Sequence, residues 1–240
     1  MQGLTLAIPS KGRLEQDSRA AFEQAGLRIE RPGGARAYIG SSVRQPDLAI
    51  RFMPATEIAR ELTRGTIDLG ITGTDLIEDA TESSADHVLV VKSLGFGQAD
   101  VVVAVPDPWI DVTQMTDLAD VAADFRTRHG RWLRVATKYV NLTRRHFANH
   151  GMIEYRIVES TGATEAAPAA GTADLIVDIT SSGSTLAANA LRVLEDGVIL
   201  KSEAQLYVSR KTDWTPMRRA QLEALMSIVG WVPPGISTQL

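Results

Sequence analysis

The sequence predicts an α/β fold with two lobes. Apolar runs of strand length alternate with amphipathic helical patterns along most of the 240 residues. Hydrophobic residues make up 44% of the chain and charged residues 22%, which is typical of a globular protein with a sizeable core. Gly95 and Gly97 separate two apolar runs, which indicates a hinge where the chain passes from one lobe to the other.

The first part of the chain is predicted to hold a buried strand, an amphipathic helix that ends at Gly26, and a loop or irregular hairpin over residues 31–45. A helix starting at Leu76 follows a glycine-rich turn and a short strand within residues 65–75. The remaining expected elements are strands at 4–8, 47–52, 88–91 and 101–105, and helices at 14–25 and 55–64.

The second part continues the alternation. Asn141 is expected to cap a helix that Gly151 ends, and Pro216 marks the start of the last helix. The expected helices are 116–129, 141–149, a short one at 163–170, and 215–229; the expected strands are 132–136, 154–159, 174–178 and 198–209.

The stretch 174–186 carries the main candidate site. A strand that includes Asp178 passes into a cluster of hydroxyl side chains around Gly183 and then into a helical pattern from Thr185. Unpaired backbone N–H groups and the positive end of the helix dipole can bind a phosphate there, while Asp178 suits sugar hydroxyls or a metal. The arrangement predicts a ribose-phosphate ligand; the alternative is that these residues only cap the helix.

Two further turns could form ligand edges. Lys11, Gly12 and Arg13 follow the first strand, where cations and a permissive glycine suit an anion, although a solvated basic turn is the alternative. Gly73 and Thr74 lie between a strand and a helix, and here the alternative is that Asp75 caps that helix.

Lys138 and Glu165 are the remaining charged candidates. Lys138 follows a strand and could contact an anion, or could simply be exposed. Glu165 falls in the first turn of a short helix, where the helix dipole by itself favours a carboxylate. Because parallel strands bring their carboxyl ends to one edge, Glu165 and Asp178 are expected to face the same pocket.

Composition excludes several classes of function. The absence of cysteine excludes thiolate metal sites, and the four histidines show no ligand-like pair, so any metal is expected to come with the substrate. A net charge of −4 disfavours nucleic-acid binding. No apolar run of about 18 residues predicts a membrane span, and no signal peptide is visible, so a cytoplasmic location is expected.

With these segments in place, the chain resembles the short form of ATP phosphoribosyltransferase, the first enzyme of histidine biosynthesis. Each motif is weak alone, but their order is specific. The motifs are Pro9-Ser10-Lys11-Gly12-Arg13-Leu14, Asp68-Leu69-Gly70-Ile71-Thr72-Gly73, Leu94-Gly95-Phe96-Gly97, Ala136-Thr137-Lys138-Tyr139, Glu159-Ser160-Thr161-Gly162-Ala163-Thr164-Glu165 and Val177-Asp178-Ile179-Thr180-Ser181-Ser182-Gly183-Ser184-Thr185-Leu186.

The resemblance implies a fold like that of type II periplasmic binding proteins, with the active site in a cleft between two lobes. Lobe one would comprise residues 1–98 and 181–240, and lobe two residues 99–180. The reaction implied transfers the phosphoribosyl group of phosphoribosyl pyrophosphate to N1 of ATP and releases pyrophosphate. The alternative is a cytoplasmic two-lobed ligand-binding or sensor module without catalysis.

Site roles follow from the same resemblance. Lys11, Arg13 and Lys138 would supply positive charge during catalysis, and Asp178 and Glu165 would contact the ribose hydroxyls or Mg²⁺. The remaining substrate-binding assignments are Gly12, Asp68, Gly73, Thr164, Ser181, Ser182, Gly183, Ser184 and Thr185. One departure concerns an arginine that the family often carries near positions 53–55 of this chain, where the nearest arginine is Arg51.

The resemblance also predicts partners. The chain ends before the C-terminal regulatory domain of the long form, so feedback control by histidine is expected to require a separate regulatory subunit that resembles histidyl-tRNA synthetase. An oligomer is expected as well.

Overall fold

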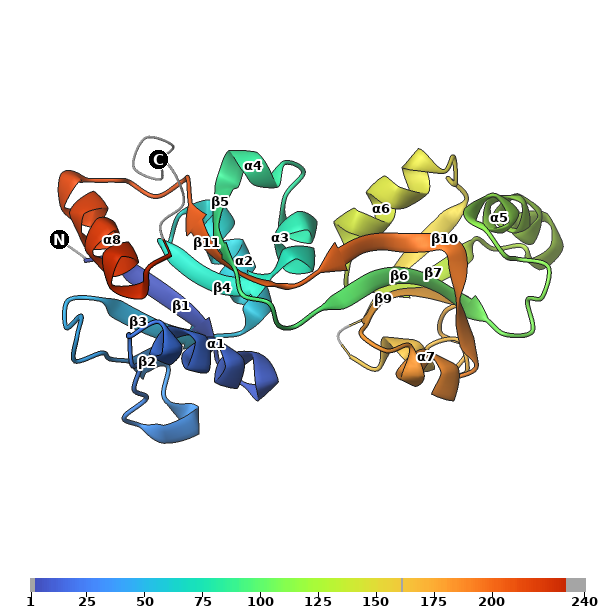
Figure 1. Ribbon diagram of the computed structural model, residues 1–240. Coiled ribbons are helices and arrows are strands. Elements are labelled where there is room, and N and C mark those ends of the chain that lie inside the picture. Colours follow the sequence, from blue (N-terminus) through green and yellow to red (C-terminus); the bar gives the residue numbers. More distant parts are fainter. Residues whose placement is uncertain (1–2, 161, 232–240) are drawn as a thin grey trace. The chain divides into compact units, whose positions relative to one another are not determined.

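The computed structural model describes residues 3–160 and 162–231, and the chain divides into two compact units (Figure 1). Unit 1 takes the chain up to Gly97 and from Glu203 onward, and unit 2 takes Gln98–Ser202. Residues 181–202, which the sequence assigned to lobe one, therefore belong to unit 2. The reason is strand pairing: β10 (Leu191–Ser202) pairs antiparallel with β6 (Ala99–Pro106) and holds this segment in the second sheet.

Unit 1 is built on a mixed sheet of six strands in the order β2-β3-β1-β4-β11-β5. The central strand β1 is parallel to β3 and β4, whereas β11 is antiparallel to β4 and β5. The strands are β1 (Thr5–Pro9), β2 (Ile39–Gly40), β3 (Ala49–Met53), β4 (Leu69–Gly73), β5 (Val88–Ser93) and β11 (Ala204–Ser209); the helices are α1 (Gly12–Gln24), η1 (Gly34–Arg36), α2 (Ala55–Arg64), α3 (Thr74–Ala80), α4 (Ser84–His87) and α8 (Pro216–Val229).

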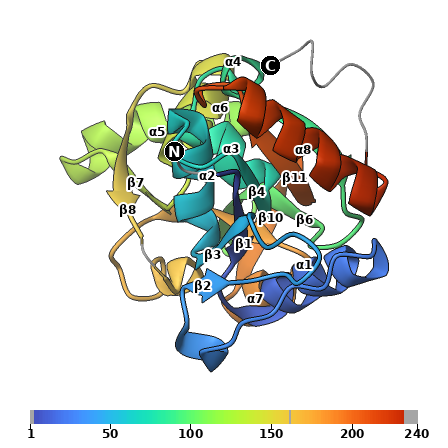
Figure 2. The ribbon, with the colours of Figure 1, turned by 90° about the vertical axis from the view of Figure 1, so that its left-hand side faces the viewer.

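Alternation along β1 divides the core of unit 1 into two layers. Leu6 and Ile8 pack in one cluster with Phe22 of α1 and Leu222 of α8. On the other face, Ala7 packs with side chains of α2 and α3. Helices α1 and α8 thus cover one face of the sheet and α2 and α3 cover the other (Figure 2).

Unit 2 holds a five-stranded mixed sheet in the order β10-β6-β9-β7-β8. Strand β7 is parallel to both β8 and β9, while β6 is antiparallel to β9 and β10. Residues 101–105 of β6 are all buried, which explains their unbroken apolar run. The other elements are α5 (Met115–His129), β7 (Leu133–Thr137), α6 (Val140–Asn149), β8 (Tyr155–Glu159), η2 (Thr164–Ala166), β9 (Leu175–Thr180) and α7 (Ser184–Ala188).

Local details differ from the sequence predictions in several places. The single strand expected over 198–209 is two strands, β10 and β11, which belong to different sheets. The helix expected over 163–170 is only the 3₁₀ turn η2. Asn141 lies inside α6, whose N-cap is Tyr139, and Gly73 rather than Asp75 occupies the N-cap of α3. At α3 and α6 the end of the preceding strand sets where the helix begins.

Candidate functional site

The carboxyl ends of β7, β8 and β9 form one edge of the sheet of unit 2. In the parallel register Thr137 of β7 pairs with Val177 of β9 and with Glu159 of β8. The residues that follow these partners, including Lys138 and Asp178, therefore lie next to one another at this edge. We call this edge the unit 2 edge.

Asp178 is the electrostatic centre of the unit 2 edge. Burial raises the pKa of its carboxyl, and the nearby Glu165 carboxylate raises that pKa further. The Ile179 N–H, which donates to Asp178 Oδ1 at 2.8 Å, the Lys138 ammonium and a hydrogen bond with Thr164 oppose this rise without cancelling it. The structure therefore brings Lys138, Thr164 and Glu165 close enough to Asp178 for each of them to act on its carboxylate.

The hydroxyl loop continues directly from Asp178. Gly183 has φ of +72°, a left-handed conformation that favours glycine, and precedes the first turn of α7. Its N–H donates to Thr180 Oγ1 at 2.8 Å, and the Oγ atoms of Ser182 and Ser184 lie 2.8 Å apart. The N–H groups of the first turn have no acceptor within the helix, so this loop presents backbone and hydroxyl donors to an anion.

Three hydroxyl side chains that the sequence analysis did not assign a role support this edge. Thr137 Oγ1 accepts the N–H of Tyr139 at 2.9 Å and fixes the turn that carries Lys138. Ser160 Oγ and Thr164 Oγ1 lie 3.0 Å apart, within hydrogen-bond distance. Thr180 closes the loop around Gly183. Their only sequence signal is a hydroxyl residue at or just after a strand end, which is too common to single them out.

A second edge lies in unit 1, at the carboxyl ends of β1 and β4. These strands are parallel, with Leu6 paired to Leu69, so the turn at residues 10–13 and the turn at Gly73 lie at the same end of the sheet. Lys11 occupies the N-cap of α1, and Gly12 has φ of +73° with no atom within 4 Å of the place that a methyl group would take. Lys11 and Arg13 are exposed, so both cations are accessible at this edge, which we call the unit 1 edge.

Next to Gly73 the unit 1 edge is rich in carboxylates. The main-chain oxygen of Glu203 accepts from the Thr74 N–H at 3.1 Å, and its side chain accepts from Ser93 Oγ at 2.6 Å. Tyr207 donates to Thr74 Oγ1 at 3.5 Å. Burial, together with nearby carboxylates that include Glu203, raises the pKa of Tyr207 to about 12. This part of the edge suits a hydrogen-bond donor better than a phosphate, and Glu203 and Tyr207 were not among the predicted site residues.

Asp68 does not join either edge, contrary to the assignment from sequence. It precedes β4 and therefore lies at the opposite end of this strand from Gly73. Its buried carboxylate accepts the Thr5 N–H at 2.7 Å and forms an ion pair with Arg218 of α8 at 3.6 Å. The side chain thus ties α8 to the amino end of β1, which is a structural role.

Among the described residues, no group of three or more His, Cys, Asp or Glu side chains is arranged to hold a metal ion. No ligand-like histidine pair was expected, yet His146 and His150 lie one turn apart with ring centroids 4.4 Å from each other. Burial lowers the pKa of His146 to about 4. For a cation, Asp178 and Glu165 offer two carboxylates, which fits an ion shared with ligand oxygens.

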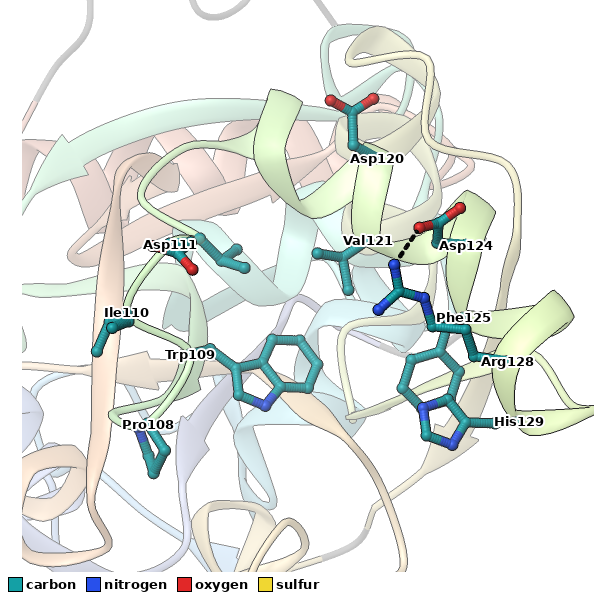
Figure 3. Close-up of a pocket in the computed structure, with 11 residues that line it drawn as sticks. Pro108, Trp109, Ile110, Asp111, Asp120, Val121, Asp124, Phe125, Arg128 and His129 are labelled. Atoms are coloured by element: carbon teal, nitrogen blue, oxygen red, sulfur yellow. Dashed lines mark hydrogen bonds and ion pairs between the residues drawn. The ribbon is translucent and has the colours of Figure 1, made fainter.

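One hollow in unit 2, of about 440 Å³, contains none of the predicted site residues (Figure 3). It lies between the segment 108–112 and α5, with Trp109 on one side and Phe125 on the other. The ion pair between Arg128 and Asp124 at 2.8 Å compensates charge on its α5 side. It is separate from the unit 2 edge, because Pro108 and Asp111 follow β6, which runs antiparallel to β9 and ends at the other side of the sheet.

The fold and its two polar strand edges define an α/β protein of the type found among two-domain ligand-binding proteins. Solved structures with this fold include the substrate-binding protein of an amino acid ABC transporter, with a TM-score of 0.52, 11% identity and coverage of 95% of this chain and 91% of that one. The arginine-bound form of truncated ArgBP from T. maritima has a TM-score of 0.51 and 14% identity over 95% of each chain. At these identities the likeness shows the fold alone.

Sequence comparison then gives the family. A family model described as HisG, ATP phosphoribosyltransferase, matches residues 54–229. The ATP phosphoribosyltransferases of Bradyrhizobium sp. (strain ORS 278) and Nitrobacter winogradskyi are 57% and 56% identical over 212 residues. These matches cover 88% of this chain and 65% of each relative, so the chain spans just under two thirds of their length. The chain belongs to the ATP phosphoribosyltransferase family.

A solved structure of the ATP phosphoribosyl transferase (HisG:HisZ) complex from Thermotoga maritima is also similar, with a TM-score of 0.67 and 26% identity. The match covers 95% of this chain and 98% of that one. Family and fold therefore agree with the α/β class and the family resemblance predicted from sequence. Separately, among the described residues no helix combines the length and apolar character needed to cross a membrane.

Proposed function

We propose that this chain transfers the phosphoribosyl group of phosphoribosyl pyrophosphate to N1 of ATP and releases pyrophosphate. Membership of the family, with relatives of that name at 57% identity, is the observation that carries the proposal. The unit 2 edge supports it, because a donor loop for a phosphate directly follows a carboxylate suited to sugar hydroxyls. A binding module without catalysis is not favoured, since the transporter-type neighbours share only the fold.

The unit 2 edge would hold the phosphoribosyl group. The loop from Ser181 to Thr185 supplies backbone and hydroxyl donors for the 5′-phosphate. Asp178 and Glu165 accept hydrogen bonds from the ribose hydroxyls, and Lys138, held by the turn at Thr137, offsets their charge and that of the phosphates. Thr164 is buried and keeps Asp178 oriented through its hydrogen bond.

The bond changes need no nucleophile from the protein. The N1 lone pair of the adenine forms a bond to C1 of the ribose, and the electron pair of the breaking C1–O bond leaves with pyrophosphate. Positive charge develops on the sugar and negative charge on the leaving group, so catalysis rests on positioning and on charge stabilisation. Lys11 and Arg13, exposed on the unit 1 edge, supply positive charge for the polyphosphates, with Gly12 permitting close approach.

Mg²⁺ would accompany the substrate. It would neutralise the pyrophosphate charge, with Asp178 or Glu165 as protein ligands beside substrate oxygens. Burial is the main cause of the raised pKa of Asp178, and repulsion by the Glu165 carboxylate adds to it; a bound cation or a set of hydroxyl donors would relieve both.

An assay with a matched pair of variants tests the proposal. The purified chain is incubated with ATP, phosphoribosyl pyrophosphate and Mg²⁺, and both pyrophosphate and the N1-phosphoribosyl adduct of ATP are quantified. Asp178→Asn should cost roughly 10²-fold in kcat/KM. Asp120 is exposed on α5, and the control variant Asp120→Asn should leave kcat/KM unchanged. Absence of the adduct in the presence and absence of a partner chain would refute the activity.

We further infer that a separate regulatory subunit resembling histidyl-tRNA synthetase acts with this chain. The support is the similar structure from Thermotoga maritima, which is a HisG:HisZ complex. Feedback by histidine would then be a coupling between two chains, typically about 1–3 kcal/mol. Titration of histidine against the isolated chain should leave its activity intact, and inhibition at micromolar histidine would show an internal regulatory site.

A further inference from the structure

A second charged hollow lies in unit 2, at the opposite end of the sheet from the unit 2 edge. It has a volume of about 590 Å³ and is lined by Arg126, Gly130, Arg131, Trp132, Arg134 and Arg156. Arg131 and Trp132 precede β7, Arg134 lies in its first half and Arg156 near the start of β8. Since β7 has five residues, roughly 16 Å of strand separate this arginine pocket from Lys138.

Among the described residues, one carboxylate, that of Asp174, pairs with arginines of the pocket, and it pairs with two of the four. Asp174 accepts from Arg131 at 2.6 and 2.8 Å in a two-pronged pair, and from Arg134 at 3.2 Å. In the described part of the chain neither Arg126 nor Arg156 makes an ion pair. The pocket therefore carries a surplus of positive charge in a chain whose net charge is −4.

The strand register makes this surplus costly. Arg134 and Arg156 are direct partners across the β7 and β8 pair, and like charges placed opposite one another destabilise a sheet. The other two guanidinium groups each lie over an aromatic ring: Arg126 lies 5.7 Å from the Trp132 ring centroid, and Arg131 lies 4.8 Å from that of Phe125. Four guanidinium groups that line one hollow, at a cost in stability, are typical of a site whose ligand supplies the missing negative charge.

We propose that the arginine pocket binds an oligophosphate anion, such as the di- or triphosphate of a nucleotide, independently of the transferase site. A ligand with a single carboxylate would leave most of the positive charge of the pocket uncompensated. A chain of phosphoryl groups offers many acceptor oxygens to the planar guanidinium groups. The volume lies within the range of small-molecule sites. Trp132, about half exposed, would report on occupancy directly.

The experiment uses the Trp132 indole N–H as a reporter in NMR titrations of the full chain. Its resonance is assigned with Trp132→Phe, and the probe is inorganic tripolyphosphate without divalent cations. A saturable shift is expected, and Arg126→Gln combined with Arg156→Gln should weaken the fitted affinity at least about tenfold. The control, Arg28→Gln combined with Arg60→Gln, removes the same charge from exposed sites in unit 1. This control should change the fitted affinity for tripolyphosphate less than about twofold.

Thermal unfolding provides a second readout that does not depend on the transferase reaction. Arg156→Gln should raise the Tm without ligand, because it removes the repulsion with Arg134, and tripolyphosphate should raise the Tm of the wild type more than that of the double variant. A Trp132 resonance that does not shift up to about 10 mM probe, or equal affinities in the two double variants, would overturn the proposal. Comparison of tripolyphosphate with a nucleoside triphosphate then shows whether the base contributes.

Discussion

Gly183→Ala tests whether the hydroxyl loop contacts the phosphate of the substrate. Gly183 has φ of +72°, and among the described residues no atom lies within 4 Å of the methyl group that alanine would add. The left-handed conformation costs a non-glycine residue roughly 1–2 kcal/mol, partly offset by the lower entropy of the unfolded chain, so the net loss of stability is about 1 kcal/mol. For a domain of this size, this loss lowers the Tm by about 2–4 °C.

The effect on activity should be larger than this strain explains. The methyl group would extend from the loop into open space, and in the proposed function the 5′-phosphate approaches the N–H groups of Ser184 and Thr185 at this loop. We expect the KM for phosphoribosyl pyrophosphate to rise about tenfold or more, which corresponds to about 1.4 kcal/mol, with the KM for ATP little changed.

Gly171→Ala is the matched control. Gly171 has φ of +68° and also has no atom within 4 Å of an added methyl group, so both variants carry the same backbone strain. Steady-state kinetics and thermal unfolding of both variants should show similar losses in Tm and a raised KM only for Gly183→Ala. An unchanged KM in a folded Gly183→Ala variant would refute the phosphate-binding role of the loop.

Three other variants probe the remaining contacts. Burial raises the folded-state pKa of Asp178, so its negative charge destabilises the folded state once the pH rises through that pKa. The Asp178→Asn variant should therefore unfold at an equal or higher denaturant concentration than the wild type at pH 7, while losing activity. A large destabilisation of this variant would contradict the reasoning. Burial by itself would raise the pKa of Asp174, but hydrogen bonds from Arg131 and Arg134 lower that pKa to about 2. The charged carboxylate therefore stabilises the folded state above the ordinary pKa of an aspartate, and this stabilisation is lost as the pH falls towards 2. Unfolding free energies of wild type and Asp174→Asn should therefore differ at pH 7 and converge near pH 2, and a constant difference would show that ionisation is not the cause. Arg31 donates to the Ser10 carbonyl at 3.0 Å and to Glu15 at 2.8 Å, directly beside the basic turn; Arg31→Lys should keep the charge but lower kcat/KM, whereas unchanged kinetics would show that the turn holds its shape without this clamp.

Strong local signals made several elements predictable from sequence. Helix α2 has the bounds 55–64 that its apolar period and the following Gly65 indicated, because the left-handed glycine ends the helix locally. Helix α8 begins after Thr215, whose side chain accepts the Arg218 N–H, as expected for a capping residue before a proline. The loop around Gly183 was likewise visible because strand, hydroxyl cluster and helix follow one another in the chain.

Long-range pairing decided what the sequence alone could not. The separation of β10 from β11 depends on their partners β6 and β4, and the paired residues are at least 85 positions apart in the chain (Leu191 with Pro106). Asp68 belongs to one of the sequence motifs, but only the fold shows that its side chain pairs with Arg218, at the end of β4 opposite to Gly73. The arginine pocket, too, exists only because β7 and β8 pair Arg134 with Arg156. Periodicity and capping act within a few residues and can be read along the chain, whereas register and convergence of side chains are set by which strands meet.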